Sequence, residues 1–409
     1  MLTQPSPTQA PLPTIIRDCG FISAMGSTDQ EIKLSIMDSR HANMLQDTST
    51  LNTQTETVVG RVATPLADIP VQFKRYQSRN NQLALSALLK IETTVQSAIA
   101  QFGSNRIAVV IGTSTSGISD GESAYKQHLD SNQFPSDFDY TKQELGNTSE
   151  FIAQYLGTTG PCYSISTACS SSGRVFITAK RMLNAGLVDA VIVGGVDTLC
   201  QLTLNGFNGL EALSTSLCQP FSANRNGINI GESAALMLLS HQAIENQLTP
   251  ENKHIALLGA GDSSDAHHIS APHPDGHGAI KAMQNALDDA GLEANDIGYI
   301  NAHGTATPLN DSMESKAIHH VFGENTLVSS TKPLTGHTLG AASATEAAIA
   351  WYILNYDLPL PKQGCNDKAS DIDIRLVEEE CKLDKKAILS NSFAFGGNNI
   401  SLIFGYTDE

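Results

Sequence analysis

The chain has 409 residues, 41% of them hydrophobic, and it carries 25 Lys and Arg against 42 Asp and Glu, a formal net charge of −17. This length predicts about two to three domains with ample interior, and the acidic balance argues against wholesale binding to nucleic acid or to an anionic membrane. Only 16% of the residues are charged, against a usual ~25%. This indicates a high ratio of interior or subunit interface to solvent-exposed surface and favours an oligomer.

The N-terminal segment and the cysteines bear on the compartment. Residues 1–7 lack the basic region and the apolar core of a secretory signal, and no apolar run approaches the ~18 residues of a membrane span. We therefore expect a soluble, cytoplasmic protein whose residues 1–12 form a Pro-rich disordered tail. The seven cysteines include no C-x-x-C pair, which predicts neither a zinc site nor a disulfide framework.

Short apolar runs that end in glycine or small residues are typical of buried strands in an α/β protein. Such runs occur at 107–112, 190–195, 297–302 and 387–390. Helices are expected in three segments with glycine or proline stop signals, at 172–185, 278–290 and 340–355.

Two further segments bear on domain organisation. The polar stretch 246–252 separates two sets of strand and helix units, which predicts an N-terminal half over 13–250 and a C-terminal half over 251–409. Residues 118–150 are polar and weakly periodic. We expect them to form an insertion of loops and short helices outside the core.

Cys169 is the first candidate for chemistry. It lies in the stretch 162–173, where a strand-like segment passes through small residues into a predicted helix. A thiolate is favoured at a helix N-terminus, because unpaired N–H groups and the positive end of the dipole stabilise its charge. Small neighbours leave room for a substrate at the sulfur. The sequence predicts a nucleophile here, with a buried, inert cysteine as the alternative.

Two histidines and a glycine-rich segment have comparable contexts. His303 follows a strand-like run, His337 precedes an Ala-rich helix, and each lies next to glycine at the end of a loop. Either one is a candidate catalytic imidazole or a hydrogen-bonded turn residue. The segment 392–398 could aim a backbone N–H at a developing oxyanion, or it could be an ordinary turn.

Together these pieces resemble the β-ketoacyl-[acyl-carrier-protein] synthases, the decarboxylating condensing enzymes of the thiolase superfamily. The matching segments are ordered along nearly the whole chain, at 167–171, 220–232, 265–276, 303–314, 332–337 and 391–397. The resemblance implies a thiolase-like α/β fold of two pseudo-equivalent, layered α-β-α-β-α halves.

The resemblance also implies a separate catalytic role for each residue of the site. Cys169 takes an acyl group from acyl-carrier protein, and the N–H groups of Cys169 and Phe395 hold the oxyanion. His303 and His337 then donate hydrogen bonds to the thioester oxygen of malonyl-carrier protein as it loses CO₂. Two neutral imidazoles suit this task, because a nearby carboxylate would oppose the developing negative charge.

Supporting roles follow from the same resemblance. Lys332 supplies a compensating positive charge and hydrogen-bonds Glu314 close to the histidines. The hydroxyls of Thr305 and Thr307 hold the phosphopantetheine arm, which carries the substrates, so that no separate cofactor is expected.

The acyl pocket and the C-terminal loop carry both matches and departures. Phe207 matches a side chain that lines the acyl pocket, with a plain core position as the alternative, and Phe393 is assigned to substrate binding. Residues 394–399 read Ala-Phe-Gly-Gly-Asn-Asn where the family usually has Gly-Phe-Gly-Gly-Thr-Asn, and alanine narrows the backbone freedom of the Phe395 gate. The family's usual Phe-Asp, Arg-Asp-Gly and Gly-Glu-Gly are replaced by Phe-Ser at 221–222, Arg-Asn-Gly at 225–227 and Gly-Glu-Ser at 231–233. Together with 79–81 and 111–117, these departures resemble ketosynthases of aryl-polyene clusters more than housekeeping fatty-acid enzymes.

The resemblance names acyl-carrier protein as the partner. Carrier proteins of this family are strongly acidic, so docking on a chain of net charge −17 needs a local basic patch. Lys74 and Arg75 match the family's docking region, whereas its usual second basic cluster falls in the acidic stretch 136–139. A solvated run of surface charge is the alternative. We also expect a homodimer, or a heterodimer with a related ketosynthase-like subunit.

A group of four histidines has the composition of a metal site, comprising His267, His268, His273 and His277. Prolines and glycines between them exclude a shared helical i,i+4 face, so we expect no metal and a loop near the pantetheine tunnel.

Three relatives of the predicted enzyme are disfavoured. A degradative thiolase needs a second cysteine in the C-terminal glycine loop, and residues 392–399 contain none. Initiating type III synthases use Cys-His-Asn, but the last position here is His337. A chain-length-factor partner lacks the nucleophile, whereas Cys169 is present.

Overall fold

The computed structural model describes residues 12–53, 55–245, 254–365, 367–385 and 387–407. The predicted tail falls almost entirely on residues outside this range, and so does the expected boundary near residue 250. Both stay predictions.

The described residues form a mixed α/β fold around one long sheet, in which two sets of five strands repeat the same order. In the first set each strand is hydrogen-bonded to the next in the order β1 (Thr14–Ser23), β8 (Ser233–Ser240), β6 (Ala190–Asp197), β4 (Ile107–Gly112) and β5 (Cys162–Ile165). In the second the order is β9 (Ile255–Ser264), β14 (Asn398–Tyr406), β13 (Ala387–Phe393), β10 (Ile297–Asn301) and β11 (Leu327–Ser329), with β12 (Arg375–Leu376) at the edge.

The pairing directions repeat as well. In each set the first two contacts are antiparallel and the next two are parallel. The sets join where β1 pairs with β9 in antiparallel register, with Thr14 opposite Leu257. This internal repeat confirms the expected fold of two pseudo-equivalent halves. The four predicted strands are β4, β6, β10 and β13.

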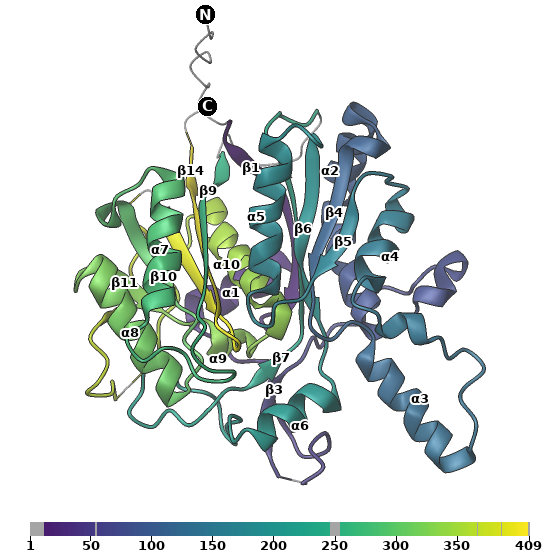
Figure 1. Ribbon diagram of the computed structural model, residues 1–409, viewed down its shortest axis with the longest axis horizontal. Helices are drawn as coiled ribbons and strands as arrows, with labels where there is room; N and C mark the ends of the chain where they lie inside the picture. The colour runs from purple at the N-terminus through teal and green to yellow at the C-terminus, as the bar shows by residue number, and fades with distance from the viewer. Residues whose placement is uncertain (1–11, 54, 246–253, 366, 386, 408–409) are drawn as a thin grey trace, which may run out of the picture.

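Helices form three layers around the two sets of strands (Figure 1). The central layer consists of α5 (Ser171–Asn184) and α10 (Ala342–Tyr356), which pack on each other and on both sets. The outer layers are α2 (Arg79–Phe102) with α4 (Asn147–Leu156), and α7 (His277–Ala290) with α8 (Pro308–Phe322). The predicted helices 172–185, 278–290 and 340–355 are α5, α7 and α10.

The composition of α10 and α2 explains their positions. Every residue of α10 from Ala342 to Leu354 is buried, because a helix composed mainly of small and apolar residues fits between the two sets of strands. Helix α2 is long and apolar enough to cross a membrane. Eleven of its residues are buried within the fold, and it packs on β1, β8 and α4.

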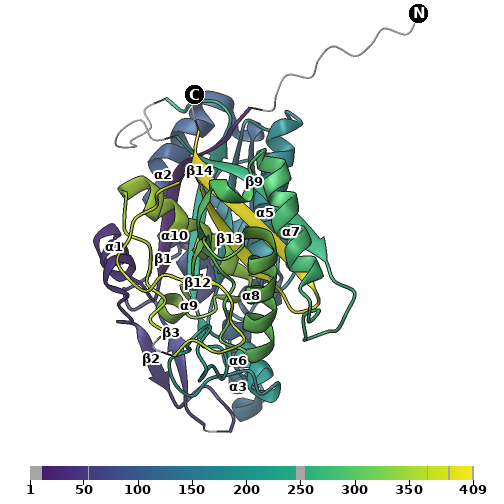
Figure 2. The ribbon, with the colours of Figure 1, turned by 90° about the vertical axis from the view of Figure 1, so that its left-hand side faces the viewer.

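Smaller elements complete the fold. Helix α1 (Asp29–Asp38) follows β1, α6 (Gln201–Gly209) lies near one end of the molecule, and the short helix α9 (Lys332–Thr335) is buried. A small sheet of β2 (Met44–Asp47), β3 (Thr57–Gly60) and β7 (Ile230–Gly231) lies beside α9 (Figure 2).

The predicted insertion 118–150 is helical at both ends. Helix α3 (Ile118–Ser131) projects from the body (Figure 1) and buries only Ala124. Residues 147–149 begin α4 and are buried, so the last part of this segment belongs to the core.

Candidate active site

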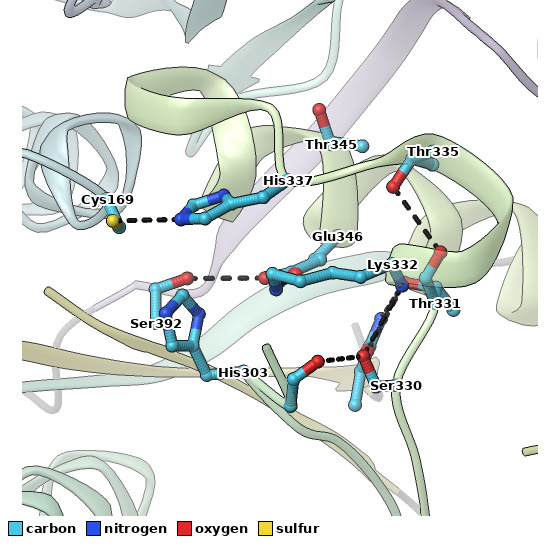
Figure 3. Close-up of polar contacts among 12 residues, drawn as sticks. Cys169, His303, Ser330, Thr331, Lys332, Thr335, His337, Thr345, Glu346 and Ser392 are labelled. Atoms are coloured by element: carbon cyan, nitrogen blue, oxygen red, sulfur yellow. Dashed lines mark hydrogen bonds and ion pairs between the residues drawn. The ribbon is translucent and has the colours of Figure 1, made fainter. Parts of the chain in front are cut away.

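Eight of the predicted site residues line one cavity of about 420 Å³: Cys169, Phe207, His303, Thr305, Thr307, His337, Phe393 and Phe395. They come from both halves of the chain. Lys332 and Glu314 are buried near the two histidines, and Lys74 and Arg75 lie elsewhere, on the surface. Figure 3 shows the polar centre of this arrangement.

Cys169 lies in a tight turn between β5 and α5. Ala168 has a φ of 54°, a left-handed conformation that costs a non-glycine residue free energy and is common at functional sites. The hydroxyl of Ser171 accepts a hydrogen bond from the Thr167 N–H at 2.8 Å and holds the turn together. The turn directs the thiol into the cavity, with 6% of Cys169 exposed.

His337 is held by backbone hydrogen bonds to the segment around β7. Its N–H donates to the carbonyl of Asn229 at 2.6 Å, and its carbonyl accepts from the N–H of Gly231 at 3.0 Å. Gly336 precedes it with a φ of 71° and leaves no room for a Cβ against Gly231. The ring is therefore fixed with Nε2 3.0 Å from the Cys169 sulfur.

His303 is held by a buried carboxylate. Glu314 on α8 accepts hydrogen bonds from the backbone N–H groups of His303 and Gly304, both at 2.7 Å. Burial raises the pKa of the Glu314 carboxyl to about 7, although these N–H groups favour its charged form. The rings of His303 and His337 meet edge to face, with centroids 5.3 Å apart, so both imidazoles border the same space beside the sulfur.

The predicted hydrogen bond between Lys332 and Glu314 is wrong. The Lys332 ammonium donates to Glu346 on α10, with Nζ 2.6 Å from Oε1, and the Ser392 hydroxyl donates to the other oxygen of Glu346 at 3.2 Å (Figure 3). The reason is geometric. Both oxygens of Glu314 already accept hydrogen bonds from the backbone of the His303 loop. Lys332 is the first residue of the short helix α9, and its side chain extends to Glu346 on α10.

Burial and charge keep both imidazoles neutral. The pKa values of His303 and His337 lie well below the ordinary value, first because the rings are buried and second because the positive charge of Lys332 disfavours a further cation. Within the described residues, Nδ1 of neither ring has a hydrogen-bond partner. Buried N–H groups without a partner are rarer than buried acceptors without one, so we assign the proton of each ring to Nε2, which makes each ring a donor toward the cavity.

The comparison with known proteins identifies this arrangement. Residues 21–243 match the N-terminal domain of β-ketoacyl synthases, and residues 254–365 match the C-terminal domain. The chain belongs to the β-ketoacyl synthase family. It is 34% identical over 342 residues to 3-oxoacyl-[acyl-carrier-protein] synthase 2 of Staphylococcus aureus (strain COL), which covers 81% of this chain and 82% of that protein.

Solved structures give the same result. A chain in the complex of the ketosynthase ApeO with its chain length factor ApeC, from Xenorhabdus doucetiae, is 45% identical, with a TM-score of 0.91 over 97% of this chain and 98% of that one. A β-ketoacyl synthase from Burkholderia phymatum STM815 is 26% identical, with a TM-score of 0.83 over 97% and 100% of the two chains. The synthase is therefore a condensing acyltransferase.

The thiol of this synthase does not behave as the sequence predicts. Burial raises the pKa of Cys169 to about 11, although the charge of Lys332 and the N–H groups of Phe395 and Cys169 oppose the rise. The expected lowering by the helix N-terminus is thus outweighed by desolvation. The resting nucleophile is a neutral thiol, and it must give up its proton as it attacks.

We expect alkylation of Cys169 by iodoacetamide to rise about tenfold per pH unit from pH 7 to pH 9, because only the thiolate reacts and its fraction is far from saturation. The measurement is the alkylation rate of the Cys169 peptide by mass spectrometry, with glutathione as the reference thiol. A plateau for Cys169 below pH 9 would contradict the neutral resting state.

The backbone N–H groups of Phe395 and Cys169 favour the charged form of the Cys169 sulfur, so both lie close to it. Their role as the oxyanion site stays a prediction. Gly396 and Gly397 have φ values of 82° and 77°. Ala394 is absent from the positive-φ residues, so alanine fits this loop without strain, and its effect on the gate stays a prediction.

The rest of the cavity matches the expected substrate path. Phe207 on α6 and Phe395 are in ring contact, with centroids 5.8 Å apart, and Phe393 is 6.3 Å from the His303 ring. The hydroxyls of Thr305 and Thr307 lie 2.9 Å apart on the cavity wall. The cavity therefore has an apolar part, formed by the three phenylalanines, and a wall that carries the two threonine hydroxyls.

Two contributors escaped the sequence analysis. Glu346 binds Lys332, and the backbone of Asn229 fixes His337. Glu346 had a usable signal, since it is the only charged residue of an otherwise apolar helix. A buried charge of this kind requires a partner. Asn229 acts through its carbonyl, so its side chain carries no signal of the role.

Lys74 and Arg75 are exposed on a short 3₁₀ helix over Val71–Tyr76. They border a surface hollow together with Lys142, Asp137 and Asp139. The Arg75 guanidinium lies over the Tyr76 ring, 4.6 Å from its centroid. The acidic stretch 136–139 therefore faces this basic pair across the hollow and reduces the local positive charge.

Proposed function

We propose that this synthase catalyses a decarboxylative Claisen condensation between an acyl group on Cys169 and malonyl-acyl-carrier protein. The product is a 3-oxoacyl-acyl-carrier protein, as expected in fatty-acid, polyene or polyketide synthesis. The observation that carries the proposal is the pairing of one thiol with two neutral imidazoles in a single cavity. Thr305 and Thr307 would hold the phosphopantetheine arm of each substrate, and no metal or separate cofactor takes part.

In the first half-reaction the Cys169 sulfur attacks the acyl-thioester. The N–H groups of Cys169 and Phe395 stabilise the oxyanion. The Nε2–H of His337, 3.0 Å from the sulfur, donates a hydrogen bond to the sulfur and stabilises it as the thiol loses its proton. The proton ends on the departing pantetheine sulfur, and the acyl group remains on Cys169.

In the second half-reaction malonyl-carrier protein loses CO₂, and the electron pair of the broken C–C bond forms an enolate. His303 and His337 each donate an Nε2–H to the enolate oxygen, which stabilises the developing charge. Lys332 adds a positive charge that Glu346 keeps in place. The enolate carbon then attacks the acyl carbonyl, a C–C bond forms as the C–S bond to Cys169 breaks, and the departing thiolate takes a proton from solvent, which restores the Cys169 thiol.

We further propose that the synthase works in the cytoplasm with acyl-carrier protein and with a second subunit, in an aryl-polyene-type pathway. The support is its likeness to a chain from a complex of a ketosynthase with its chain length factor, together with the aryl-polyene-like departures in its motifs. Because Cys169 is present, this chain takes the ketosynthase position in such a pair, or forms a homodimer.

Product analysis tests the proposal. The purified synthase, with and without its candidate partner subunit, is incubated with defined acyl- and malonyl-carrier proteins, and the carrier-bound products are read by mass spectrometry. We expect 3-oxoacyl products, with chains longer than one condensation only when the partner is present. Loss of CO₂ without a new C–C bond under both conditions would overturn the condensing assignment.

The basic pair Lys74 and Arg75 is proposed to dock the acidic carrier protein. We expect Lys74→Glu with Arg75→Glu to raise KM for carrier-protein substrates several-fold, because charges at the rim of an interface mainly govern association. Steady-state kinetics on carrier-bound and on small pantetheine thioesters measure the effect.

The small thioester is the internal control, since it does not need the docking surface. Lys281→Glu with Lys316→Glu, a charge-matched change elsewhere, should leave both KM values near wild type. Equal losses on both substrate types in the Lys74 and Arg75 variant would mean that this segment supports the fold, and the docking role would then be withdrawn.

A further inference from the structure

A second group of ligating side chains lies at the start of α7, outside the catalytic cavity. His273, Asp275 and His277 each offer one ligand atom, and these atoms lie within 4.8 Å of one another. The rings of His273 and His277 have centroids 4.4 Å apart, and that of His267 is 4.9 Å from His273. The condensation proposed above uses none of these side chains.

The backbone explains how these residues meet without a shared helical face. Gly276 adopts a left-handed conformation, with a φ of 65°, and its N–H donates to the His273 carbonyl at 2.8 Å. This turn folds 273–275 back onto the first residue of α7, His277. The prolines and glycines here exclude an i,i+4 helical face, but a left-handed turn provides another way to bring the ligands together.

The chemistry of the donors selects the kind of ion. Imidazole nitrogens with one carboxylate oxygen suit Zn²⁺ and similar divalent ions, which bind four ligands at about 2.0–2.2 Å. The side chains of Asp275 and His277 are exposed and that of His273 is partly so, so they can rotate the short way needed to close around an ion. We propose that His273, Asp275, His277 and His267 form a zinc-binding site.

The site adjoins the wall of the catalytic cavity. His268 and residues 270–272, between the ligands His267 and His273, line that cavity. The same segment is tied to the gate loop, because the Asp265 N–H donates to the Gly397 carbonyl at 2.7 Å and the Gly396 N–H donates to the Ile269 carbonyl at 2.9 Å. A bound ion would tie both ends of this cavity wall to α7.

Cobalt(II) binding tests the proposal, because Co²⁺ reports its ligands by absorption. The full-length protein, freed of any affinity tag, is titrated with CoCl₂, and Zn²⁺ is then added to displace the cobalt. We expect one tetrahedral-type visible band per chain, bleached by Zn²⁺, without a thiolate-to-cobalt charge-transfer band. His273→Ala with His277→Ala should weaken binding at least tenfold, and His277→Ala alone should weaken it measurably.

The matched control is His319→Ala with His320→Ala on α8, which removes the same number of histidines and should bind cobalt as the wild type does. A thiolate band that disappears in Cys169→Ala would mean that the ion uses Cys169, His303 and His337, whose ligand atoms also lie within 4.8 Å of one another, and would overturn the proposal. Unchanged binding by the His273 and His277 variant would overturn it equally. Neither result would affect the condensation assigned to Cys169.

Discussion

Cys169→Ala is expected to abolish condensation, with no 3-oxoacyl product above background. Among the described residues that line the cavity, Cys169 is the only cysteine, so no second thiol can accept the acyl group. The measurement is product formation from acyl- and malonyl-carrier proteins, together with the intact mass of the protein after exposure to acyl-carrier protein. The wild type should gain the mass of one acyl group, and the variant none.

Two variants sharpen this result. Cys169→Gln should keep malonyl decarboxylation or raise it, because its amide oxygen can accept the N–H groups of residues 169 and 395 as an acyl carbonyl would. Cys381→Ala removes a thiol that does not line the cavity and should condense normally. Condensation by the Cys169→Ala protein would contradict the assignment of Cys169 as the acyl acceptor.

His303→Ala and His337→Ala are each expected to slow malonyl decarboxylation by about 10²-fold or more, the scale of a lost oxyanion donor. Each ring is buried, neutral and bordered by the cavity, so each contributes one N–H to the enolate oxygen. Release of CO₂ from malonyl-carrier protein measures this step without the condensation. Replacement by Gln, which keeps a neutral donor, should restore part of the rate.

Acylation of Cys169 provides the contrast for these variants. His303 has no assigned role in that step, so His303→Ala should still be acylated. If acylation vanished while decarboxylation stayed normal, the assignment of the histidines to the malonyl half-reaction would be wrong. His241→Ala, at a partly exposed position outside the cavity lining, should alter neither step.

The sequence predicted the parts of the site that depend on local pattern. The apolar run 107–112 and the helix stop at Gly186 follow from short-range rules, and the structure has β4 and α5 there. The match of Cys169, His303 and His337 to ordered motifs brought together three residues that the fold places around one cavity.

The parts that failed depend on contacts between distant elements. Lys332 and Glu314 both match motifs of the family, but the side-chain partner of Lys332 depends on how α9 packs against α10. The local sequence around Lys332 cannot predict that contact. Glu346 could have been noted as a lone charge in an apolar helix, although its partner could not have been named.

The thiol of Cys169 shows a second limit. Its place before α5 correctly indicated nearby N–H groups, and these do favour the thiolate. Their effect is smaller than the cost of desolvating a charge in a site that closes over the sulfur. Both halves of the fold together bury the sulfur to this degree. The local sequence therefore indicated that the N–H groups lower the pKa of Cys169, but it could not indicate the larger rise caused by burial.

A single turnover tests the central claim most directly. Synthase acylated at Cys169 and freed of excess acyl donor is mixed with malonyl-carrier protein labelled with ¹³C at C2, and the protein, the carrier and the released CO₂ are followed together. The account predicts that the acyl mass leaves Cys169 as 3-oxoacyl-carrier protein appears with the label at C2, with one CO₂ released per product. An acyl group that stays on Cys169 while the labelled product forms would contradict it.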